Sequence, residues 1–540
     1  MWEPCVSLAR FSTRSTRSSL SRLFLEPARA DGIVQAMRVA ETAFPIALLA
    51  LAGCPSDGSE FASDVPASST APSHDGASTD SSDTSTSGTG TETTVPSESG
   101  DGDGDGDGDG DGDAEFCPFS PPLIIEGPDE LSGFGGALAV ADFNGDGAAD
   151  MAVGAHSLGP AREGGVFLYL SSSGTLPAQG QRIAGDIPGG GAGLAIAAGD
   201  VTGDGRPDLV VGAPGNSPYT PTPTGSVAIY ENLGGADFAL SRRIDRGAAS
   251  NQLGFSLAIG EVNGDGFNDL VVGVRQYSDD LGAAFVYLSS SGGELGSDPV
   301  ILPGDFPGEY AGHAVAVHTL PSGQPGTMAY SSTHRRGFLG GAWVVPGSST
   351  LPFDSPSVVD YSETNDALQG YSLAFVPSSV GPLLALGAPS AVPAGKPGDS
   401  WGAVFVWAPD QAGTYEGEPL LLEGPKTRSA TGISLAVGDV NGDGLSDLAA
   451  GMPQYNDDVG LPGKGAVEFF LGDGLGGFTR ADFRVRGATD RMFLGTALQI
   501  ADVNGDGRDD LVVTAPQDTL NSESSRGEVR VYFGGHDACP

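Results

Sequence analysis

The sequence has few of the side chains that enzymes most often use for chemistry. Only six of the 540 residues are His, and only four are Cys. It contains no Ser nucleophile motif, no His-rich metal site and no Gly-rich loop of the kind that cradles phosphate. We therefore expect no catalytic site in this chain.

Basic residues and long apolar runs are also scarce. The chain has 26 Lys and Arg residues against 69 Asp and Glu residues, which gives a formal net charge of −43. Nucleic-acid binding depends on clustered Lys and Arg, so this charge argues against a nucleic-acid partner. No apolar run is long enough to span a bilayer, which leaves an N-terminal targeting segment to consider.

The N-terminal region resembles an export signal. Residues 1–36 have no packing pattern and are interpreted as an upstream extension from a mis-assigned start, and residues 37–53 as a signal peptide. The segment Leu51–Cys54 resembles the lipobox of bacterial lipoproteins, which implies cleavage before Cys54 and lipid attachment to its thiol. The alternative is an ordinary secretory signal. The lipoprotein interpretation predicts a chain that is exported and lipid-anchored to the bacterial outer membrane or cell surface.

The segment 54–115 is rich in Ser, Thr, Asp, Gly and Pro, and it ends in alternating Asp and Gly at Asp101–Asp113. Such a composition buries too little apolar surface to offset the entropy of ordering, so we predict a disordered linker. The Asp101–Asp113 run formally has the spacing of a cation loop. It has no flanking strands, and we interpret it as a spacer.

The remaining sequence contains a nine-residue pattern that occurs five times. Each copy places oxygen-bearing side chains at positions one, three, five and nine, and Gly at position six. Such oxygens suit a hard cation such as Ca²⁺, and Gly allows the backbone to turn sharply. The predicted ligands, for about five structural Ca²⁺ ions, are Asp142, Asn144, Asp146 and Asp150; Asp200, Thr202, Asp204 and Asp208; Glu261, Asn263, Asp265 and Asp269; Asp439, Asn441, Asp443 and Asp447; and Asp502, Asn504, Asp506 and Asp510.

A longer repeat surrounds these loops. A Gly stands seven residues before each loop, and two more such glycines fill the gap between the third and fourth loops. These anchor glycines recur at intervals of roughly sixty residues, and they are Gly135, Gly193, Gly254, Gly312, Gly370, Gly432 and Gly495. Each unit has the pattern of four short strands and no helix pattern. Seven such units over residues 116–540 predict an all-β fold, a seven-bladed β-propeller.

The motifs of these units resemble a known family. Phe134-Gly135-Gly136, the nine-residue loop and Val211–Pro214 are together similar to FG-GAP repeats, which form the seven-bladed head of integrin alpha chains. The resemblance covers residues 116–540 and implies that the cation loops lie on one face of the propeller. Two units depart from the pattern, because Thr319–Thr327 and Pro377–Pro382 contain no carboxylate and should not bind metal. Thr202 replaces Asn, so we expect a weaker site in the second loop.

The last unit lacks a fourth strand, and an extra strand precedes the first anchor glycine. We predict that Pro122–Gly127 pairs with Val529–Phe533 and closes the ring, which removes an open sheet edge. Cys117 and Cys539 flank this pair, and antiparallel pairing would bring them together. We therefore predict a Cys117–Cys539 disulfide, which export would permit. Two unrelated thiols are the alternative.

In the family, the face opposite the cation loops commonly carries the ligand site. The matching loops here are Asn216–Thr224, Val274–Leu281, Ser332–Leu339 and Pro453–Lys464. Two of them contain a basic group that stands out in this acidic chain. The candidate ligand-binding residues are Arg275, Tyr277, His334, Arg335 and Arg336. Because Arg and Tyr are favoured at interface hot spots, they suggest an acidic protein or glycan ligand. The alternative is that they only solubilise a loop.

Three functions are compatible with these features. The first is a calcium-stabilised, cell-surface binding protein that recognises an extracellular protein or glycan, as in adhesion, and touches the membrane only through its lipid anchor. The second is a calcium-dependent carbohydrate-binding propeller, or a non-catalytic module of a polysaccharide-degrading system. The third, a polysaccharide lyase, would need a cluster of acid–base residues that the sequence does not display. We favour the first.

Overall fold

The computed structural model describes most of the chain from Phe119 onward. The described ranges are 119–128, 132–215, 225–235, 237–245, 250–290, 292–320, 324–353, 356–361, 367–396, 400–456, 463–516 and 526–535. The predicted signal peptide, Cys54, the linker, Cys117 and Cys539 lie outside these ranges, as does the loop Asn216–Thr224. The predictions for those residues therefore stay predictions.

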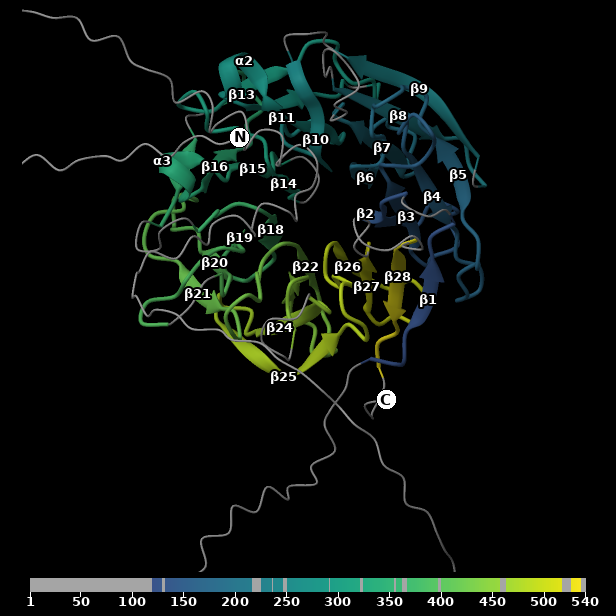
Figure 1. The fold of residues 1–540 in the computed structure, drawn as a ribbon. Coiled ribbons are helices and arrows are strands. Elements are labelled where there is room, and N and C mark those ends of the chain that lie inside the picture. Colours follow the sequence, from purple (N-terminus) through teal and green to yellow (C-terminus); the bar gives the residue numbers. More distant parts are fainter. Residues whose placement is uncertain are drawn as a thin grey trace, which may run out of the picture. The chain divides into compact units, whose positions relative to one another are not determined.

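The described residues form seven four-stranded antiparallel sheets, the blades, in which consecutive strands pair with one another (Figure 1). Blades 1 to 3 comprise β2 (Phe134–Ala141), β3 (Asp150–Ala155), β4 (Gly165–Tyr169) and β5 (Gln181–Ala184); β6 (Ala195–Gly199), β7 (Asp208–Ala213), β8 (Ser226–Asn232) and β9 (Phe238–Asp245); and β10 (Ser250–Gly260), β11 (Asp269–Gln276), β12 (Ala283–Tyr287) and β13 (Val300–Pro303).

The remaining blades follow the same order. Blades 4 and 5 comprise β14 (Val315–His318), β15 (Thr327–Ser332), β16 (Gly341–Pro346) and β17 (Ser357–Val359); and β18 (Leu373–Val376), β19 (Leu383–Ala388), β20 (Ala403–Trp407) and β21 (Leu420–Glu423). Blades 6 and 7 comprise β22 (Leu435–Gly438), β23 (Asp447–Met452), β24 (Ala466–Gly472) and β25 (Phe478–Arg486); and β26 (Leu498–Ala501), β27 (Asp510–Ala515), β28 (Glu528–Tyr532) and β1 (Leu123–Glu126).

The blades form a closed ring. The first strand of each blade packs next to the first strand of the following blade, and β26 of blade 7 packs next to β2 of blade 1. These first strands surround the centre, and the fourth strands lie outside (Figure 1). The fold is therefore a seven-bladed β-propeller, as the sequence predicts.

The closing strand also lies where the sequence places it. β1 pairs antiparallel with β28, with Leu123 opposite Val531 and Glu126 opposite Glu528. The backbone N–H of Ser120 extends this contact by donating to the Phe533 carbonyl at 2.8 Å. Blade 7 thus takes three strands from the end of the propeller sequence and one from its beginning, and the prediction for Pro122–Gly127 is confirmed.

The apolar core is divided among the seven interfaces between neighbouring blades. Alternate side chains of a strand point to opposite faces of the sheet. In β3, for example, Met151 packs towards Val512 of blade 7, and Ala152 packs towards Leu209 of blade 2. Both faces of a middle strand are therefore covered, and every residue of β3 is buried. A single blade could not bury both faces alone, so the ring stabilises each of its sheets.

The backbone geometry at the seven anchor positions explains why they are occupied by glycine. All seven have φ between 81° and 95°, a range that L side chains rarely adopt. A Cβ atom at Gly193 would lie 2.4 Å from the Gly165 carbonyl oxygen, and one at Gly312 would lie 2.3 Å from that of Ala283. A side chain here would therefore separate the strands that meet at the start of each blade.

Two short helical segments were not expected from the sequence. α2 (Tyr277–Asp280) and α3 (Arg335–Phe338) join the second and third strands of blades 3 and 4. Each contains residues with non-helical backbone angles and spans about one turn, which is too short to produce a helical period in the sequence. No helix in the described ranges has the length and apolar character needed to cross a membrane.

Candidate cation-binding loops and the opposite face

The five nine-residue loops, called the carboxylate loops below, all connect the first and second strands of their blades. They belong to blades 1, 2, 3, 6 and 7, which are consecutive around the closed ring. In an antiparallel meander, the connections between the first and second strands all emerge at the same end of the sheets. The carboxylate loops therefore share one face, the loop face, and the connections between second and third strands lie on the opposite face.

The Asp at position nine joins three parts of its blade. This residue is fully buried in all five loops: Asp150, Asp208, Asp269, Asp447 and Asp510. Its Oδ2 accepts the backbone N–H of position two at 2.8–3.1 Å. Its Oδ1 accepts an N–H from the end of the third strand at 2.6–3.0 Å. Position nine thus has a structural role that does not depend on a metal.

The carboxylate at position one is surrounded by backbone N–H groups. In blade 1, Oδ1 of Asp142 accepts from Gly145 at 2.7 Å and Oδ2 accepts from Gly147 at 2.9 Å. The same two contacts recur in the other four loops. They require a tight loop, and Gly147 has φ of 91°. Glu261 makes these contacts in the third loop despite its longer side chain.

In three of the five loops, burial and neighbouring carboxylates together raise the pKa of the position-nine Asp. Burial, and then the nearby Glu261 and Asp265 carboxylates, raise the pKa of Asp269 to about 7. Burial and neighbouring carboxylates in the same loop likewise raise the pKa of Asp447 and of Asp510 to about 6. Backbone hydrogen bonds oppose the shift but do not cancel it. In these three loops the position-nine carboxylate therefore lies near other negative charges in a partly dry environment, where a cation would relieve the repulsion.

The chemistry of these residues fits the predicted calcium. The donors are all oxygen atoms, and three carboxylates lie within nine residues of each loop. As they are oriented, however, the carboxylates accept backbone N–H groups. Among the described residues, no group of three or more His, Cys, Asp or Glu side chains is placed so that it could hold a metal ion. A coordination shell would therefore require the carboxylates of a loop to turn towards one another.

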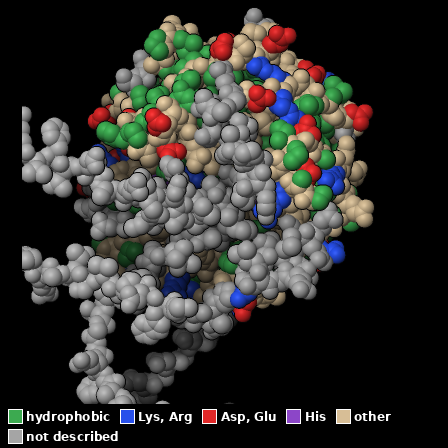
Figure 2. Space-filling model, turned by 45° about the horizontal axis from the view of Figure 1, so that its top comes forward, with side chains coloured by type: hydrophobic (Ala, Val, Ile, Leu, Met, Phe, Trp, Pro, Cys, Tyr) green, Lys and Arg blue, Asp and Glu red, His purple; other side chains and the backbone are tan. Residues whose placement is uncertain are grey.

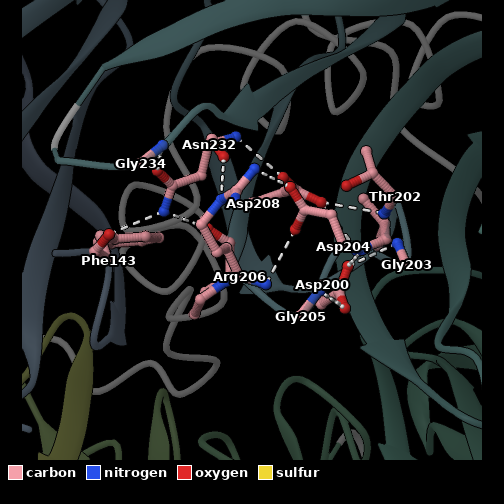
Figure 3. Close-up of polar contacts among 12 residues, drawn as sticks. Phe143, Asp200, Thr202, Gly203, Asp204, Gly205, Arg206, Asp208, Asn232 and Gly234 are labelled. Atoms are coloured by element: carbon pink, nitrogen blue, oxygen red, sulfur yellow. Dashed lines mark hydrogen bonds and ion pairs between the residues drawn. The ribbon is translucent and has the colours of Figure 1, made fainter. Parts of the chain in front are cut away.

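The second loop, drawn in Figure 3, differs from the others at position three and in the ion pair made from position seven. In the third, fourth and fifth loops the position-three Asn amide donates to the position-five carboxylate at 3.1 Å. Thr202 has no such amide. Instead, the guanidinium of Arg206 pairs with Asp204, and its Nε donates to the Asn232 carbonyl at 2.7 Å. The positive charge of Arg206 thus already neutralises one carboxylate of this loop, Asp204.

Blades 4 and 5 contain no carboxylate in the corresponding connections. In blade 4, the Thr319 hydroxyl accepts the backbone N–H of Glu261 at 3.3 Å. In blade 5, the connection is a short turn in which Gly381 N–H donates to the Ser378 carbonyl at 3.3 Å. The expectation that these connections do not bind metal stays a prediction, based on the absence of carboxylates from their sequence.

On the opposite face, Arg335 is turned into the protein. It is 6% exposed, and it pairs with Asp305 at 2.6 Å, Asp360 at 3.3 Å and Glu309 at 3.4 Å. Its guanidinium carbon also lies 4.9 Å from the centre of the Trp343 ring. We call these five residues the Arg335 cluster. Three carboxylates surround Arg335 and its neighbour Arg336, so the basic group predicted from the sequence carries no excess positive charge.

The other candidate ligand residues fall into two groups. Arg275 lies between the rings of Phe255 and Tyr310, at 5.1 and 5.2 Å, and the Tyr310 ring contacts His334. Tyr277 instead packs edge-on against Phe285 within the interface of blades 2 and 3. The structure therefore brings Arg275 and His334 together through an aromatic side chain and leaves Tyr277 apart from them.

A hollow of about 470 Å³ lies beside this group. Its lining includes Phe306, Glu309, His334, Arg336 and Phe338, from the loop after β13 and from the loop that contains α3. Phe306 is 64% exposed and Phe338 is 36% exposed, and no other aromatic side chain in the described ranges is exposed by more than a third. Two exposed aromatic rings thus line the same hollow.

Charge is mixed over the visible surface. Figure 2 shows Asp and Glu side chains scattered among Lys and Arg side chains, with no continuous basic surface among the coloured residues.

Sequence reasoning missed several polar residues that organise both faces. On the loop face these are Asn232, Asn268 and Asp509, whose side chains reach the loop of a neighbouring blade. Asn268 and Asp509 both occupy position eight of their loops, beside a predicted ligand. Their shared position in the repeat could have identified them from the sequence. Asp305, Glu309 and Asp360 were missed on the opposite face, because they lie about 25 to 30 residues from Arg335 and no local pattern connects them.

Comparison with known proteins agrees with this geometry. The FG-GAP repeat family matches residues 134–169, 192–230, 253–287, 431–467 and 494–532. These segments belong to the five blades with carboxylate loops, so blades 4 and 5 have diverged from the repeat. The chain thus carries five FG-GAP repeats within its seven-bladed propeller.

The chain is also similar to parts of longer proteins. It is 36% identical to mouse integrin alpha-3 over 144 residues, which is 26% of this chain and 14% of the relative. It is 29% identical to human integrin alpha-7 over 248 residues, 45% of this chain and 18% of the relative. Human phosphatidylinositol-glycan-specific phospholipase D is 41% identical over 101 residues, 17% of this chain and 11% of the relative. The chain therefore spans less than a fifth of the length of these relatives.

Proposed function

Because five blades of this integrin-alpha-like chain are FG-GAP repeats, we propose that the propeller is a non-catalytic head that binds an extracellular ligand and is stabilised by calcium. The observation that carries this proposal is the difference between the two faces of the ring. One face carries five carboxylate loops on consecutive blades. The other carries a hollow with two exposed aromatic side chains and an exposed Arg336.

The carboxylate loops would hold calcium through positions one, three, five and nine. A bound Ca²⁺ supplies positive charge that offsets the repulsion among these carboxylates. Position nine already ties the loop to the third strand, so a cation there would strengthen a joint of the blade that exists without it. Binding to the folded state alone would raise stability by about 2.7 kcal/mol per site when calcium is at one hundred times its dissociation constant.

Thermal unfolding tests the calcium proposal directly. We expect millimolar calcium to raise the unfolding temperature relative to EDTA. The double substitution Asp443→Asn and Asp506→Asn should reduce this rise, because position five makes the fewest backbone contacts of the three carboxylates and would contribute mainly to a metal shell. Asp473→Asn is the matched control, since Asp473 accepts backbone N–H groups in an exposed turn outside the carboxylate loops. An unfolding temperature that is the same in calcium and in EDTA would contradict the proposal.

The ligand site is assigned to the hollow between blades 3 and 4. His334, Arg336, Phe306 and Phe338 are its recognition residues, and the Arg335 cluster supports the loops that carry them. A carbohydrate-binding propeller of the type considered above should have a regular set of aromatic-lined pockets. The exposed aromatic side chains of the described ranges lie in one hollow instead, which favours a protein ligand with an apolar side chain that enters it.

Affinity capture from surface proteins tests this assignment. The double variant Phe306→Ser and Phe338→Ser should lose a partner that the unaltered chain retains after chemical cross-linking. Leu475→Ser is the matched control, because Leu475 is 69% exposed and follows the third strand of blade 6, at the loop face. Equal capture by all three proteins would contradict the site. Binding on a glycan array that requires Phe306 and Phe338 would instead favour the carbohydrate alternative.

Export, anchoring and a disulfide complete the proposal. Lipid attachment at Cys54 would place the propeller outside the cell, and Cys54→Ser should abolish metabolic labelling with a fatty acid. The pairing of Ser120 with Phe533 supports a Cys117–Cys539 disulfide, because Cys117 closely precedes Ser120 and Cys539 closely follows Phe533 in the sequence. Non-reducing peptide mapping should recover the two cysteines in one cross-linked fragment. Two separate alkylated peptides would contradict the disulfide.

A further inference from the structure

Neighbouring carboxylate loops are joined by hydrogen bonds at matching positions. In each case, position one of a loop contacts position eight of the loop in the next blade. The pairs are the Asp200 carbonyl with the Asn268 amide at 3.1 Å, the Asp439 N–H with the Asp509 carboxylate at 2.7 Å, and the Asp502 carbonyl with the Ala149 N–H at 2.8 Å. The last pair crosses the closure of the ring between blades 7 and 1.

The pair of blades 1 and 2 is joined in another way. Position eight of the second loop is Pro207, which has no N–H to donate. The amide of Asn232 replaces it, donating to the Phe143 carbonyl of blade 1 at 2.8 Å and to the Pro207 carbonyl at 3.1 Å. Asn232 is fully buried, and its own backbone N–H binds the position-nine carboxylate Asp208. Figure 3 shows this side chain between Phe143 and Asp208. The connection is therefore continuous from blade 6 through blades 7, 1 and 2 to blade 3.

These contacts attach to the parts of the loops that a cation would order. Position one is a predicted ligand, and position eight directly precedes the predicted ligand at position nine. A cation that draws the position-one carboxylate inward also fixes the backbone to which the next loop is bonded. The conformational entropy of position eight has then already been lost when the next loop binds its own cation. The second binding event therefore costs less free energy, and the two sites are positively coupled.

We propose that these contacts couple cation binding between adjacent loops, so that each bound cation raises the affinity of the neighbouring loop. Asn232, Asn268 and Asp509 are the positioning residues of this coupling. The proposal rests on the calcium binding proposed above. Because coupling between two binding sites is reciprocal, the effect of loop 6 on loop 7 equals that of loop 7 on loop 6.

The loops of blades 6 and 7 provide the test. Asp443→Asn weakens the loop of blade 6, and Asp506→Asn weakens the loop of blade 7. We compare these two variants and the double variant by calorimetric titration of the full chain with calcium. In the otherwise unaltered chain, loss of one loop should lower the calcium affinity of the other about five-fold. In the Asp509→Ala background, loss of one loop should leave the calcium affinity of the other loop unchanged.

Two further variants distinguish the effect of the Asp509 hydrogen bond from the effect of its charge and from general destabilisation. Asp509→Asn removes the charge but keeps an oxygen that accepts the Asp439 N–H, so coupling should persist. Ser446→Ala alters position eight of the blade 6 loop, whose preceding blade 5 has no carboxylate loop, so coupling should again persist. A single cooperative unfolding transition in EDTA in every background confirms that each protein is folded.

The possible results distinguish the two proposals. If no background binds calcium, the calcium proposal itself is wrong. If calcium binds but the losses of the two loops are independent in the unaltered chain, the loops are not coupled and the present inference is wrong. The same coupling in the unaltered chain and in Asp509→Ala would show that another contact carries it, and would overturn the role assigned to Asp509.

Discussion

Blades 4 and 5 are built differently from the five blades with carboxylate loops. In those five, a buried Asp at position nine ties the first two strands to the third. In blades 4 and 5, large aromatic side chains fill the interfaces. Trp343 stacks on Tyr330 with ring centres 4.9 Å apart, and Trp407 and Tyr415 are buried in the interface of these two blades. Every Trp of the propeller lies in blades 4 and 5.

The difference shows that the ring can be held in two ways. A carboxylate loop concentrates negative charge and gains stability when that charge is neutralised. Blades 4 and 5 use dispersion between buried side chains, and blade 4 also uses the buried ion pairs of Arg335; neither needs an ion from solution. The ligand hollow lies between blades 3 and 4, where the two kinds of construction meet. The proposed recognition surface therefore adjoins the part of the ring that does not depend on a cation.

The largest expected effect comes from Arg335, which should matter only to the cation-independent region. Arg335→Met leaves Glu309 and Asp360 without their buried partner, and loss of one member of a buried ion pair costs about 3–5 kcal/mol. We expect the same loss of unfolding free energy in calcium and in EDTA, measured by urea denaturation. Arg336→Met, at an exposed pair with Asp360, should cost less than about 1 kcal/mol. A loss that appears only in EDTA would contradict the separation of the two regions.

The second prediction separates two acidic positions of one carboxylate loop. Asp510→Ala removes the acceptor for the buried N–H groups of Val503 and Gly534, which should cost about 2 kcal/mol even in EDTA. Asp506→Ala removes an exposed carboxylate and should cost less than about 1 kcal/mol in EDTA. In calcium, both should lose the stabilisation that the loop provides. Chemical denaturation of both variants in the two buffers checks this, and equal losses in EDTA would contradict the structural role of position nine.

The third prediction concerns the second loop, which carries its own positive charge. Arg206→Gln frees the Asp204 carboxylate, so calcium should raise the unfolding temperature more than in the unaltered chain. The exposed ion pair itself contributes less than about 1 kcal/mol. Arg508→Gln is the matched control, because Arg508 occupies the same position of its loop but donates to the Gly535 carbonyl. An equal calcium response in the two variants would remove the distinction between their loops.

The last prediction concerns pH, and its effect vanishes at neutral pH. Burial, and then the charge of Arg162, lower the pKa of His156 to about 4. Its unfolded pKa lies near 6.5, so the unfolded chain takes up a proton first. Stability from the neutral ring is therefore complete above pH 6.5 and falls between pH 6.5 and 4. Compared with His156→Gln in EDTA, the unaltered chain should lose more stability over this range. His318→Gln in blade 4, where burial also lowers the pKa, is the counterpart.

Much of the ring could be predicted because its causes are local in the sequence. The number of blades follows from the anchor glycines, whose positive φ admits no other residue without strain. The closing strand follows from the need to pair the free edge of β28. The carboxylate loops are equally local, since all ligands lie within nine residues.

The features that escaped prediction depend on contacts between distant residues. His334-Arg335-Arg336 suggested an exposed basic surface, but the acidic partners of Arg335 come from the preceding blade and from the end of blade 4. Asn232 has no special place in its strand, and only the ring brings its amide to Phe143. Such contacts arise from the geometry of assembly, which a repeat pattern does not encode.

The shared sheet of blade 7 has a consequence for biosynthesis. The hydroxyl of Ser120 accepts the N–H of Phe533 across 413 positions of sequence. A ribosome makes β1 first and β28 last, at roughly 5–20 residues per second. β1 must therefore remain without its partner for tens of seconds while six complete blades accumulate. Until β28 is made, the blades can form only an open stack with two exposed sheet edges, and the pairing of β28 with β1 closes the ring in a late step.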